Sequence, residues 1–285
     1  MFEFIKEQSG RYPVRSLCRV LGVSRSGYYA WQNHRPTPRQ QANGRLMVQI
    51  AEVYQRSRQT YGSPRVSEAL HQQGIGCSRN RVARLMRLQR LRARTKRRFK
   101  VTTHSRHGRA VAPDLVGRCF RAPAPNRVWT SDITYVWTRE GWVYLAVVLD
   151  LFSRTIVGWE LSERLTADLI TSALSRAIDR RHPEADLIFH SDRGSQYASD
   201  ELRALLAHHQ IRASMGQTGS CYDNAVTESF FHTLKTEHTF FHRYETREQA
   251  RRSIFEYIEV FYNRQRLHST IENLSPWQFE QLHSP

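Results

Sequence analysis

The sequence predicts an α/β domain with a mixed sheet, preceded by an all-helical and strongly basic region. Three observations support this fold class. Residues 1–100 contain 22 Lys and Arg but only 4 acidic residues, whereas residues 101–285 carry a net charge of −1. Apolar residues in the first region recur with the period of a helix. From residue 126 onward, strand-like and helix-like patterns follow one another in the order β-β-β-α-β-α-β-α.

The composition excludes several classes of protein. The chain has 285 residues, 40% of them hydrophobic, and a net charge of +17, which favours a polyanionic partner such as nucleic acid. The longest apolar run, residues 142–149, is far shorter than the roughly 18 residues that span a bilayer, and no signal peptide is visible, so we expect no membrane association. The four cysteines are scattered without a CxxC pair, which argues against a disulfide framework and indicates a cytoplasmic protein.

The basic region is predicted to contain two helix-turn-helix outlines. Residues 14–21 are apolar on one helix face, Gly22 ends that helix, and Ser24 begins a second one that runs toward Trp31. The second outline consists of three predicted helices, which cover residues 45–57, 66–73 and 79–88.

Arginines cover the outer faces of the last of these helices. They are Arg79, Arg81, Arg84 and Arg87. An arginine-rich helix face is ordinarily a solvated surface, but this helix lacks the acidic partners four residues away that such faces carry. Because the surrounding region has a charge of +18, we predict that these arginines bind DNA phosphates.

We expect three parts along the chain. Residues 1–100 form the basic helix-turn-helix region, residues 101–124 form a linker, and residues 125–285 form the α/β domain. The boundary lies where the charge composition changes and where Pro123 and Pro125 favour an extended backbone. The basic region is expected to supply most of the affinity for DNA, and the α/β domain the chemistry.

The second region begins with three predicted strands, and the short links between them favour an antiparallel meander. These strands cover residues 128–136, 142–149 and 155–161. Helices and strands then alternate, with helices at 166–181, 199–209, 223–237 and 246–263 and strands at 186–190 and 211–215. The meander's aromatic residues are expected in the core; they are Trp142, Tyr144, Phe152 and Trp159.

Three carboxylates occupy positions that packing alone does not favour. Asp132 lies in the middle of a strand, Asp192 follows a parallel strand where α/β proteins place ligands, and Glu228 lies early in a helix. Any one of them alone is more often structural. Together they could converge on a divalent cation, and oxygen ligands favour Mg²⁺ or Mn²⁺. Two such ions can activate a nucleophilic oxygen and stabilise the leaving oxygen in phosphoryl transfer.

The segments around these acids resemble a known family. The acids lie in WTSDITY (129–135), HSDRGSQY (190–197) and YDNAVTESFFHTLK (222–235), and 35 residues separate Asp192 from Glu228. This set resembles the catalytic core of DDE transposases, and more narrowly the second-frame (OrfB) protein of the IS-three family of bacterial insertion sequences. The ending FYNRQRLHS (261–269) with Pro276 is similar too, so the resemblance covers about residues 45–280.

The resemblance implies an RNase H-like fold in which Asp132, Asp192 and Glu228 are the catalytic residues. It implies that these acids hold two Mg²⁺ ions, with Mn²⁺ as a substitute. It further implies cleavage of double-stranded DNA at the element ends and transfer of the freed 3′-hydroxyl strand to target DNA. The expected partners are these DNAs, a first-frame (OrfA) protein or fusion, and further copies of the chain in a homo-oligomer on DNA.

Two further expectations come from comparison with that family. Lys235 lies seven residues after Glu228, about two helical turns, so both share a helix face roughly 10 Å apart. In the family this lysine approaches terminal DNA, and the alternative is a solvated lysine. Retroviral integrases share the core and carry a His/Cys zinc unit, but here the N-terminal residues lack metal-ligand spacing, so no zinc is expected. Those residues are Cys18, His34, His71 and Cys77.

Two other functions stay open from the sequence. A hydrolytic nuclease of the same fold would cut DNA without joining strands. A DNA-binding regulator would carry the same fold with an inactive core, and the three intact acids argue against it.

Overall fold

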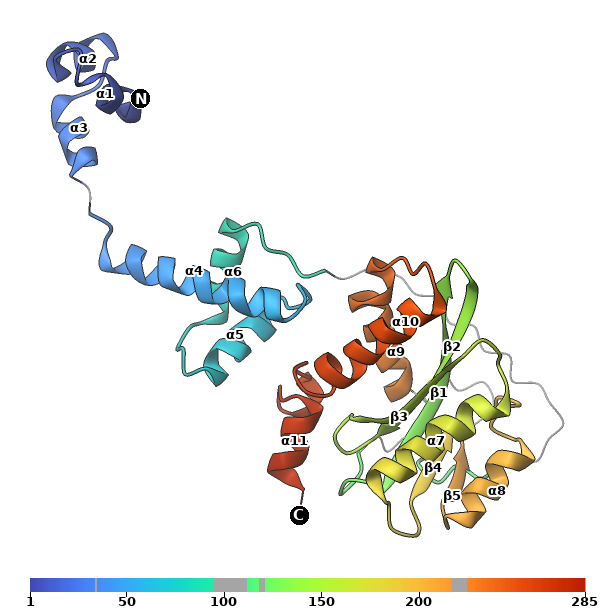
Figure 1. Cartoon of the computed structure of the whole chain (residues 1–285). Coiled ribbons are helices and arrows are strands. Elements are labelled where there is room, and N and C mark those ends of the chain that lie inside the picture. Colours follow the sequence, from blue (N-terminus) through green and yellow to red (C-terminus); the bar gives the residue numbers. More distant parts are fainter. Residues whose placement is uncertain (34, 95–111, 118–120, 217–224, 285) are drawn as a thin grey trace.

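The structure is a computed structural model that describes residues 1–33, 35–94, 112–117, 121–216 and 225–284. Two helical units come first along the chain, and an α/β domain follows them (Figure 1). In these ranges, no helix combines the length and the apolar character needed to cross a membrane. Most of the predicted linker, 101–124, lies outside the described residues, but Leu115 donates its backbone N–H to Ser214 of the α/β domain.

The first helical unit has a small core of its own. Its helices are α1 (Phe2–Gln8), α2 (Val14–Val20) and α3 (Arg25–Gln32). Ile5, Cys18 and Tyr28 fill the space between them. Ser24 caps α3 by accepting the Gly27 N–H, as its position in the sequence predicts. In Figure 1 this unit stands apart from the rest of the chain.

The second helical unit packs three helices around an apolar core. They are α4 (Pro38–Arg56), α5 (Ser63–Gln72) and α6 (Arg79–Leu88). Helix α4 begins seven residues earlier than the apolar pattern predicts, because Thr37 and Gln40 form a capping box and Pro38 suits the first helical turn. Ser78 caps α6 by accepting the Arg81 N–H.

The α/β domain contains a five-stranded mixed sheet, in agreement with the predicted fold class. Its strands are β1 (Val128–Thr138), β2 (Gly141–Asp150), β3 (Ile156–Ser162), β4 (Ile188–Ser191) and β5 (Arg212–Met215). They lie in the order β3-β2-β1-β4-β5. The first three form the expected antiparallel meander, while β4 and β5 run parallel to β1. This is the arrangement of an RNase H-like fold.

Helices cover both faces of the sheet. On one face, α7 (Ala167–Arg181) and α8 (Asp200–His208) pack against a cluster that includes Trp129, Val148 and Phe189. On the other face, α9 (Ala225–Glu237) and α10 (Arg247–Phe255) pack against a cluster that includes Val147 and Leu149. Successive residues of β2 belong to the two clusters in turn, because successive side chains of a strand point to opposite faces.

The C-terminal segment differs from the single helix predicted for residues 246–263. Helix α10 ends at Phe255 and continues as the π-helical segment η2 (Glu256–Tyr262), and a further helix, α11 (Pro276–His283), follows it. The prediction missed α11 because its start is set by a capping box between Ser275 and Gln278 rather than by a long apolar pattern.

The second helical unit is docked on this C-terminal segment. Tyr61, two residues before α5, donates its hydroxyl to the Gln265 carbonyl and accepts the Leu267 N–H at 2.7 Å. Arg58 forms an ion pair with Glu256 at 2.8 Å. The apolar residues of the helical unit and of the α9–α10 face belong to one continuous cluster. The helical unit and the α/β domain are therefore joined through packing as well as through the chain.

Candidate active site

The sheet brings the first two acids to neighbouring positions. Strands β1 and β4 run parallel, and their register pairs Ser131 with Ser191. Asp132 and Asp192 each come directly after these paired residues. Parallel strands present their carboxyl ends at one edge of a sheet, which is where α/β folds bind ligands. The two carboxylates thus lie side by side where β4 ends and β1 continues.

A buried hydroxyl pair brings in the third acid. Thr227 of α9 donates its hydroxyl to that of Thr130 of β1 at 2.8 Å, and neither side chain is exposed. Glu228 is the next residue along α9, and Thr130 lies two residues before Asp132. This contact brings α9 against β1, so that Glu228 lies near enough for its charge to act on Asp132.

A second hydroxyl pair ties the loop that carries Asp192 to β1. The Tyr197 hydroxyl lies 2.9 Å from the Ser131 hydroxyl, and Tyr197 is buried. Within the loop, Asp192 Oδ1 accepts the backbone N–H of Gly194 at 2.9 Å. These contacts hold the Asp192 carboxylate in position relative to Asp132.

The three carboxylates interact electrostatically. Burial raises the pKa of Asp132 well above its usual range, and the negative charges of Asp192 and Glu228 raise it further. Burial and the charge of Asp192 likewise raise the pKa of Glu228. The negative charges of these neighbouring carboxylates form a site that attracts positive charge.

Lys235 also belongs to this site. It is only 5% exposed, so it is not the solvated lysine of the alternative interpretation. Its ammonium nitrogen lies 4.8 Å from the centre of the Tyr135 ring. Burial lowers the pKa of Lys235 to about 8, against the opposing effect of the Asp132 charge. A buried cation therefore accompanies the three carboxylates.

The donor set consists of carboxylate oxygens, which suit a hard divalent cation. Among the described residues, no three His, Cys, Asp or Glu side chains stand close enough together to enclose a metal ion. Asp132 Oδ1 accepts the Ile133 N–H and Asp192 Oδ1 accepts the Gly194 N–H, so both carboxylates are turned toward their own backbone. Oxygen-only ligands with mutual repulsion nevertheless match the chemistry of Mg²⁺ or Mn²⁺.

The four predicted DNA-binding arginines lie on α6, in the second helical unit and not among the acids. Arg79, Arg84 and Arg87 are exposed. Arg81 is half-buried, and its Nε donates to Asn43 of α4 at 3.0 Å. Arg81 therefore helps to join α6 to α4, which its position in an arginine-rich run did not reveal.

Sequence reasoning missed the small residues that hold the acids. Thr130, Ser131 and Thr227 lie inside the motif segments, immediately beside or one residue away from an acid. Their position next to the acids in the sequence could have indicated a supporting role. The pairing of Thr130 with Thr227, however, depends on how α9 packs on the sheet. The expectation that Trp142 lies in the core was wrong: its side chain is 46% exposed, because β1 and β2 extend beyond the helices that cover the sheet.

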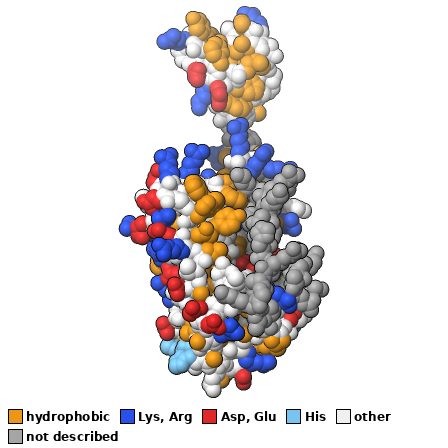
Figure 2. Space-filling view, turned by 90° about the vertical axis from the view of Figure 1, so that its right-hand side faces the viewer, with side chains coloured by type: hydrophobic (Ala, Val, Ile, Leu, Met, Phe, Trp, Pro, Cys, Tyr) orange, Lys and Arg blue, Asp and Glu red, His pale blue; other side chains and the backbone are white. Residues whose placement is uncertain are grey.

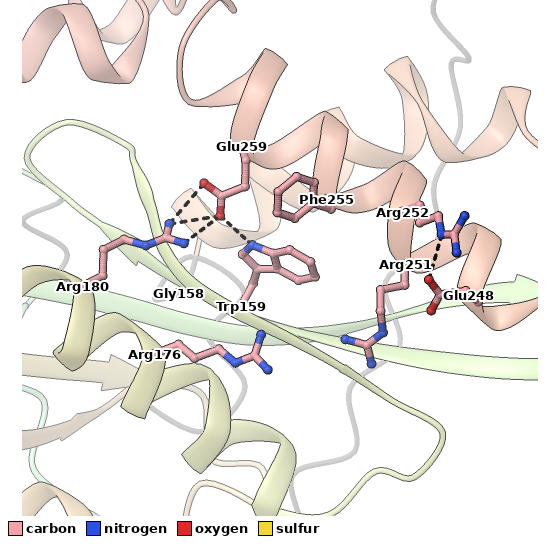
Figure 3. Close-up of a pocket in the computed structure, with 9 residues that line it drawn as sticks. All are labelled: Gly158, Trp159, Arg176, Arg180, Glu248, Arg251, Arg252, Phe255 and Glu259. Carbon is pink, nitrogen blue, oxygen red and sulfur yellow. Dashed lines mark hydrogen bonds and ion pairs between the residues drawn. The ribbon is translucent and has the colours of Figure 1, made fainter.

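A separate pocket of about 370 Å³ lies between α7, β3 and the α10–η2 helix (Figure 3). It contains none of the three acids. Arg180 and the Trp159 Nε1–H both contact Glu259, and Arg252 pairs with Glu248. Four arginines and two glutamates line the pocket, and the two other arginines, Arg176 and Arg251, share Glu160 as their ion-pair partner, so each arginine already has a carboxylate partner.

Comparison with known proteins identifies the family. Two family models of an integrase core domain match residues 122–221 and 228–283. A family model of an HTH-like domain matches residues 41–99. The chain is 43% identical over 281 residues to the transposase InsF for insertion sequence IS3A of Escherichia coli (strain K12), covering 98% of both proteins. The chain belongs to the IS3-family insertion-sequence transposases.

Another relative is the insertion element IS600 uncharacterized 31 kDa protein of Shigella sonnei, which is 46% identical over 265 residues, 93% of this chain and 97% of that protein. The fold is also similar to a chain of the simian T-cell lymphotropic virus intasome in complex with PP2A regulatory subunit B56 gamma. That match has a TM-score of 0.49 and 18% identity, over 79% of this chain and 72% of the other.

The family establishes the broad activity. As an insertion-sequence transposase, the protein is a polynucleotidyl transferase that binds DNA. The HTH-like match at 41–99 covers α4, α5 and α6, including the arginine-bearing helix. It begins after the first helical unit, although that unit also has a helix-turn-helix outline.

Proposed function

We propose that Asp132, Asp192 and Glu228 form the catalytic centre of this transposase. In this proposal the centre cleaves DNA at the element ends and transfers the freed 3′-hydroxyl strand to target DNA. The observation that carries it is the convergence of the three acids: the β1–β4 register brings two of them together, and the Thr130–Thr227 pair brings the third.

The acids would hold two Mg²⁺ ions, or Mn²⁺ in their place. Bound divalent ions supply Lewis-acid stabilisation of the attacking and leaving oxygens of a phosphodiester. The remaining work falls to the chain itself. The Thr130–Thr227 and Ser131–Tyr197 hydroxyl pairs would keep the elements that carry the acids in register. The acids could then hold the scissile phosphate in one position. Lys235 adds one positive charge next to Asp132, which offsets repulsion between the phosphodiester and the carboxylates.

Arg79, Arg84 and Arg87 would bind the phosphates of the DNA backbone outside the catalytic centre. Their exposure on α6 and the HTH-like match support this role. We further propose that the transposase acts in the cytoplasm as a homo-oligomer on DNA, with a first-frame partner or fusion. No zinc takes part in this proposal.

The test uses the full-length protein and duplex DNA that carries the element's own ends. Asp132→Asn, Asp192→Asn and Glu228→Gln should each lower cleavage and joining more than about a hundredfold, beyond the 10–100-fold typical of residues that only support metal ligands. Binding of the DNA should be kept. Asp179→Asn, the same change at an exposed position of α7, is the matched control and should stay active.

The same assay separates the rival functions. Chelation of divalent ions should stop the reaction, and either Mg²⁺ or Mn²⁺ should restore it. A nuclease would give cut ends and no joined product when a pre-cleaved end is the substrate. A regulator would bind the DNA and leave it intact in every condition. Near-normal joining by any one acid variant would remove that residue from the centre.

A further inference from the structure

An aromatic cluster lies exposed next to the turn that joins β1 to β2. Tyr135, Trp137 and Trp142 are 42%, 57% and 46% exposed. The Trp142 ring contacts the other two, with ring centres 5.0 Å from Tyr135 and 4.8 Å from Trp137, both in edge-to-face geometry. Single exposed aromatic residues are common, but a contiguous exposed group of this kind marks a binding surface.

The sheet register explains why the three rings gather. Trp137 pairs with Trp142 across the β1–β2 ladder, and Tyr135 lies two residues before Trp137 on the same face. Nearer the centre of the sheet, Ile133 and Ala146 on this face are packed into the cluster that α7 and α8 cover. Figure 2 views the molecule from the right-hand side of Figure 1, and on that face hydrophobic side chains are exposed with Lys and Arg side chains above them.

Lys235 connects the cluster to the proposed catalytic centre. Lys235 stacks on the Tyr135 ring at 4.8 Å, and Asp132 lies three residues before Tyr135 on β1. At about 3.3 Å per strand residue, the Cα atoms of Tyr135 and Trp137 lie roughly 10 and 17 Å along β1 from that of Asp132. The rings project from the opposite face of the sheet to the Asp132 side chain, beyond the point where the pairing with β4 ends at Ser191. Stacked nucleotides of one DNA strand are about 3.4 Å apart, so the rings lie roughly three to five nucleotides from a phosphate at the acids.

We propose that Tyr135, Trp137 and Trp142 form a stacking surface for unpaired DNA bases close to the reacting phosphate. The inference rests on the proposed catalytic centre, because that centre fixes where the DNA strand runs. Ring faces bind bases of any sequence, since every base has a flat aromatic face. The neighbouring Lys235 matches the charge of the backbone that such bases carry.

This surface would favour DNA ends whose terminal pairs are already open. Base pairs near the acids must separate before a base can leave the stack and rest on a ring, and a ring that holds the base offsets the cost of opening. The occupant is therefore the substrate strand itself, and a second protein copy is the competing occupant that the test must separate.

The test compares two DNA probes on the full-length protein in the presence of a chelator, so that no cleavage occurs. One probe is a duplex with the element's own end fully paired, and the other has mismatched terminal pairs. The native protein should prefer the opened end. Trp137→Ala and Trp142→Ala should each lose roughly tenfold in affinity for the opened end only, equivalent to about 1.4 kcal/mol of base stacking. The variants Trp137→Phe and Trp142→Phe should keep most of the preference.

Trp277→Ala is the matched control, because Trp277 is 54% exposed on α11 and does not belong to the cluster. It should behave as the native protein. A second measurement places a photoreactive iodouracil at the opened positions, and mass spectrometry should find the cross-link on one of the three rings.

Several outcomes would overturn the proposal. They are equal affinity of the native protein for both probes, equal losses on both probes in the alanine variants, and cross-links elsewhere. A change of oligomeric state in Trp137→Ala or Trp142→Ala without any change in probe preference would assign the cluster to a protein interface. Because this experiment measures binding without metal, its result does not depend on whether the three acids are catalytic.

Discussion

Asp132, Asp192 and Glu228 are each positioned by a small neighbour whose hydroxyl or backbone N–H spans two parts of the fold. The Thr130–Thr227 pair joins β1 to α9, and the hydroxyls of Ser131 and Tyr197 join β1 to the loop after β4. Neither pair is charged, so neither competes with the acids for a cation. In the proposed centre, the acids would supply the chemistry, and the hydroxyl pairs join the elements that carry them.

Lys235 gives a prediction at the scale of one residue. Lys235→Met keeps the aliphatic packing of a side chain that is 5% exposed but removes its charge. We expect it to weaken the binding of DNA ends. It should also make the slope of log affinity against log salt concentration, the salt slope, shallower by about one unit, the value for one phosphate that is no longer neutralised. Lys235→Arg should restore part of the affinity, because it restores the cation beside Tyr135. Fluorescence anisotropy across a salt series measures both quantities.

An unchanged salt slope in Lys235→Met, with reduced cleavage, would assign Lys235 to the balance of charge among the acids rather than to DNA contact. Unchanged binding and cleavage together would remove it from the site.

At the scale of elements, the close packing of β3 on α7 depends on Gly158. A Cβ atom at this position would collide with the Ala173 carbonyl oxygen and stand 2.7 Å from the Ala177 Cβ. Backbone of α7 cannot move away without disturbing the core of that face. We expect Gly158→Ala to lower the free energy of unfolding by about 3 kcal/mol or more, measured by urea denaturation.

Gly44 supplies the matched control for that change. It lies in the middle of α4, and a Cβ there would meet nothing within 4 Å. Gly44→Ala should therefore raise the free energy of unfolding by about 0.5–1 kcal/mol, because alanine costs less backbone entropy in a helix. Equal effects of the two substitutions would contradict the packing argument.

The elements themselves were predictable to different degrees. The five strands and helices α7 and α8 were predicted near their observed bounds, because alternating and 3.6-residue patterns report which side chains face a core. Helix α11 and the early start of α4 were missed, since capping boxes and proline set them. The π-helical turn of η2 has no pattern in the sequence that separates it from an ordinary helix.

At the scale of the whole molecule, a buried ion pair joins three regions. Arg266, which follows η2, donates to both oxygens of Glu237 at 2.7 Å, and Arg65 of α5 lies 3.3 Å from the same carboxylate. Glu237 ends α9, the helix that carries Glu228. The pair therefore links the docked helical unit to the element that positions the third acid.

We expect Glu237→Gln to lower the free energy of unfolding by about 3–5 kcal/mol at neutral pH, because it leaves Arg266 buried without its partner. Burial alone would raise the pKa of Glu237, but the hydrogen bonds and charges of Arg266 and Arg65 outweigh it and lower the pKa. The pair's stabilisation is thus complete above the unfolded pKa of about 4.3 and is lost as the pH falls through the lower folded pKa. The difference between native and variant should narrow below about pH 4.

Urea denaturation over a pH series measures this difference. Glu256→Gln is the control, because Glu256 pairs with Arg58 but is 64% exposed. It should change stability by less than about 1 kcal/mol. A pH-independent difference for Glu237→Gln would show that its effect comes from packing and not from charge.

The uneven charge of the chain gives the last prediction. Arg84→Gln combined with Arg87→Gln should weaken binding of duplex DNA and reduce the salt slope by about 1.8 units, or 0.9 for each phosphate that the variant no longer neutralises. Arg203→Gln combined with Arg212→Gln removes the same charge from the α8–β5 edge of the α/β domain. This control pair should leave the slope nearly unchanged. Equal effects of the two pairs would move the DNA surface onto the catalytic domain.

The sequence by itself determined the order and type of most elements and the separation of charge, and it pointed to the three acids that we propose as the catalytic centre. These properties depend on local periodicity, on composition and on short motifs, which are complete within neighbouring residues. Only the tertiary structure decided that Thr130 meets Thr227, that Lys235 is buried against Tyr135, and that Trp142 is exposed. The first two are contacts between residues that are far apart in the chain, and the exposure of Trp142 depends on where a covering helix ends. Such contacts arise from the packing of whole elements, which no local pattern records.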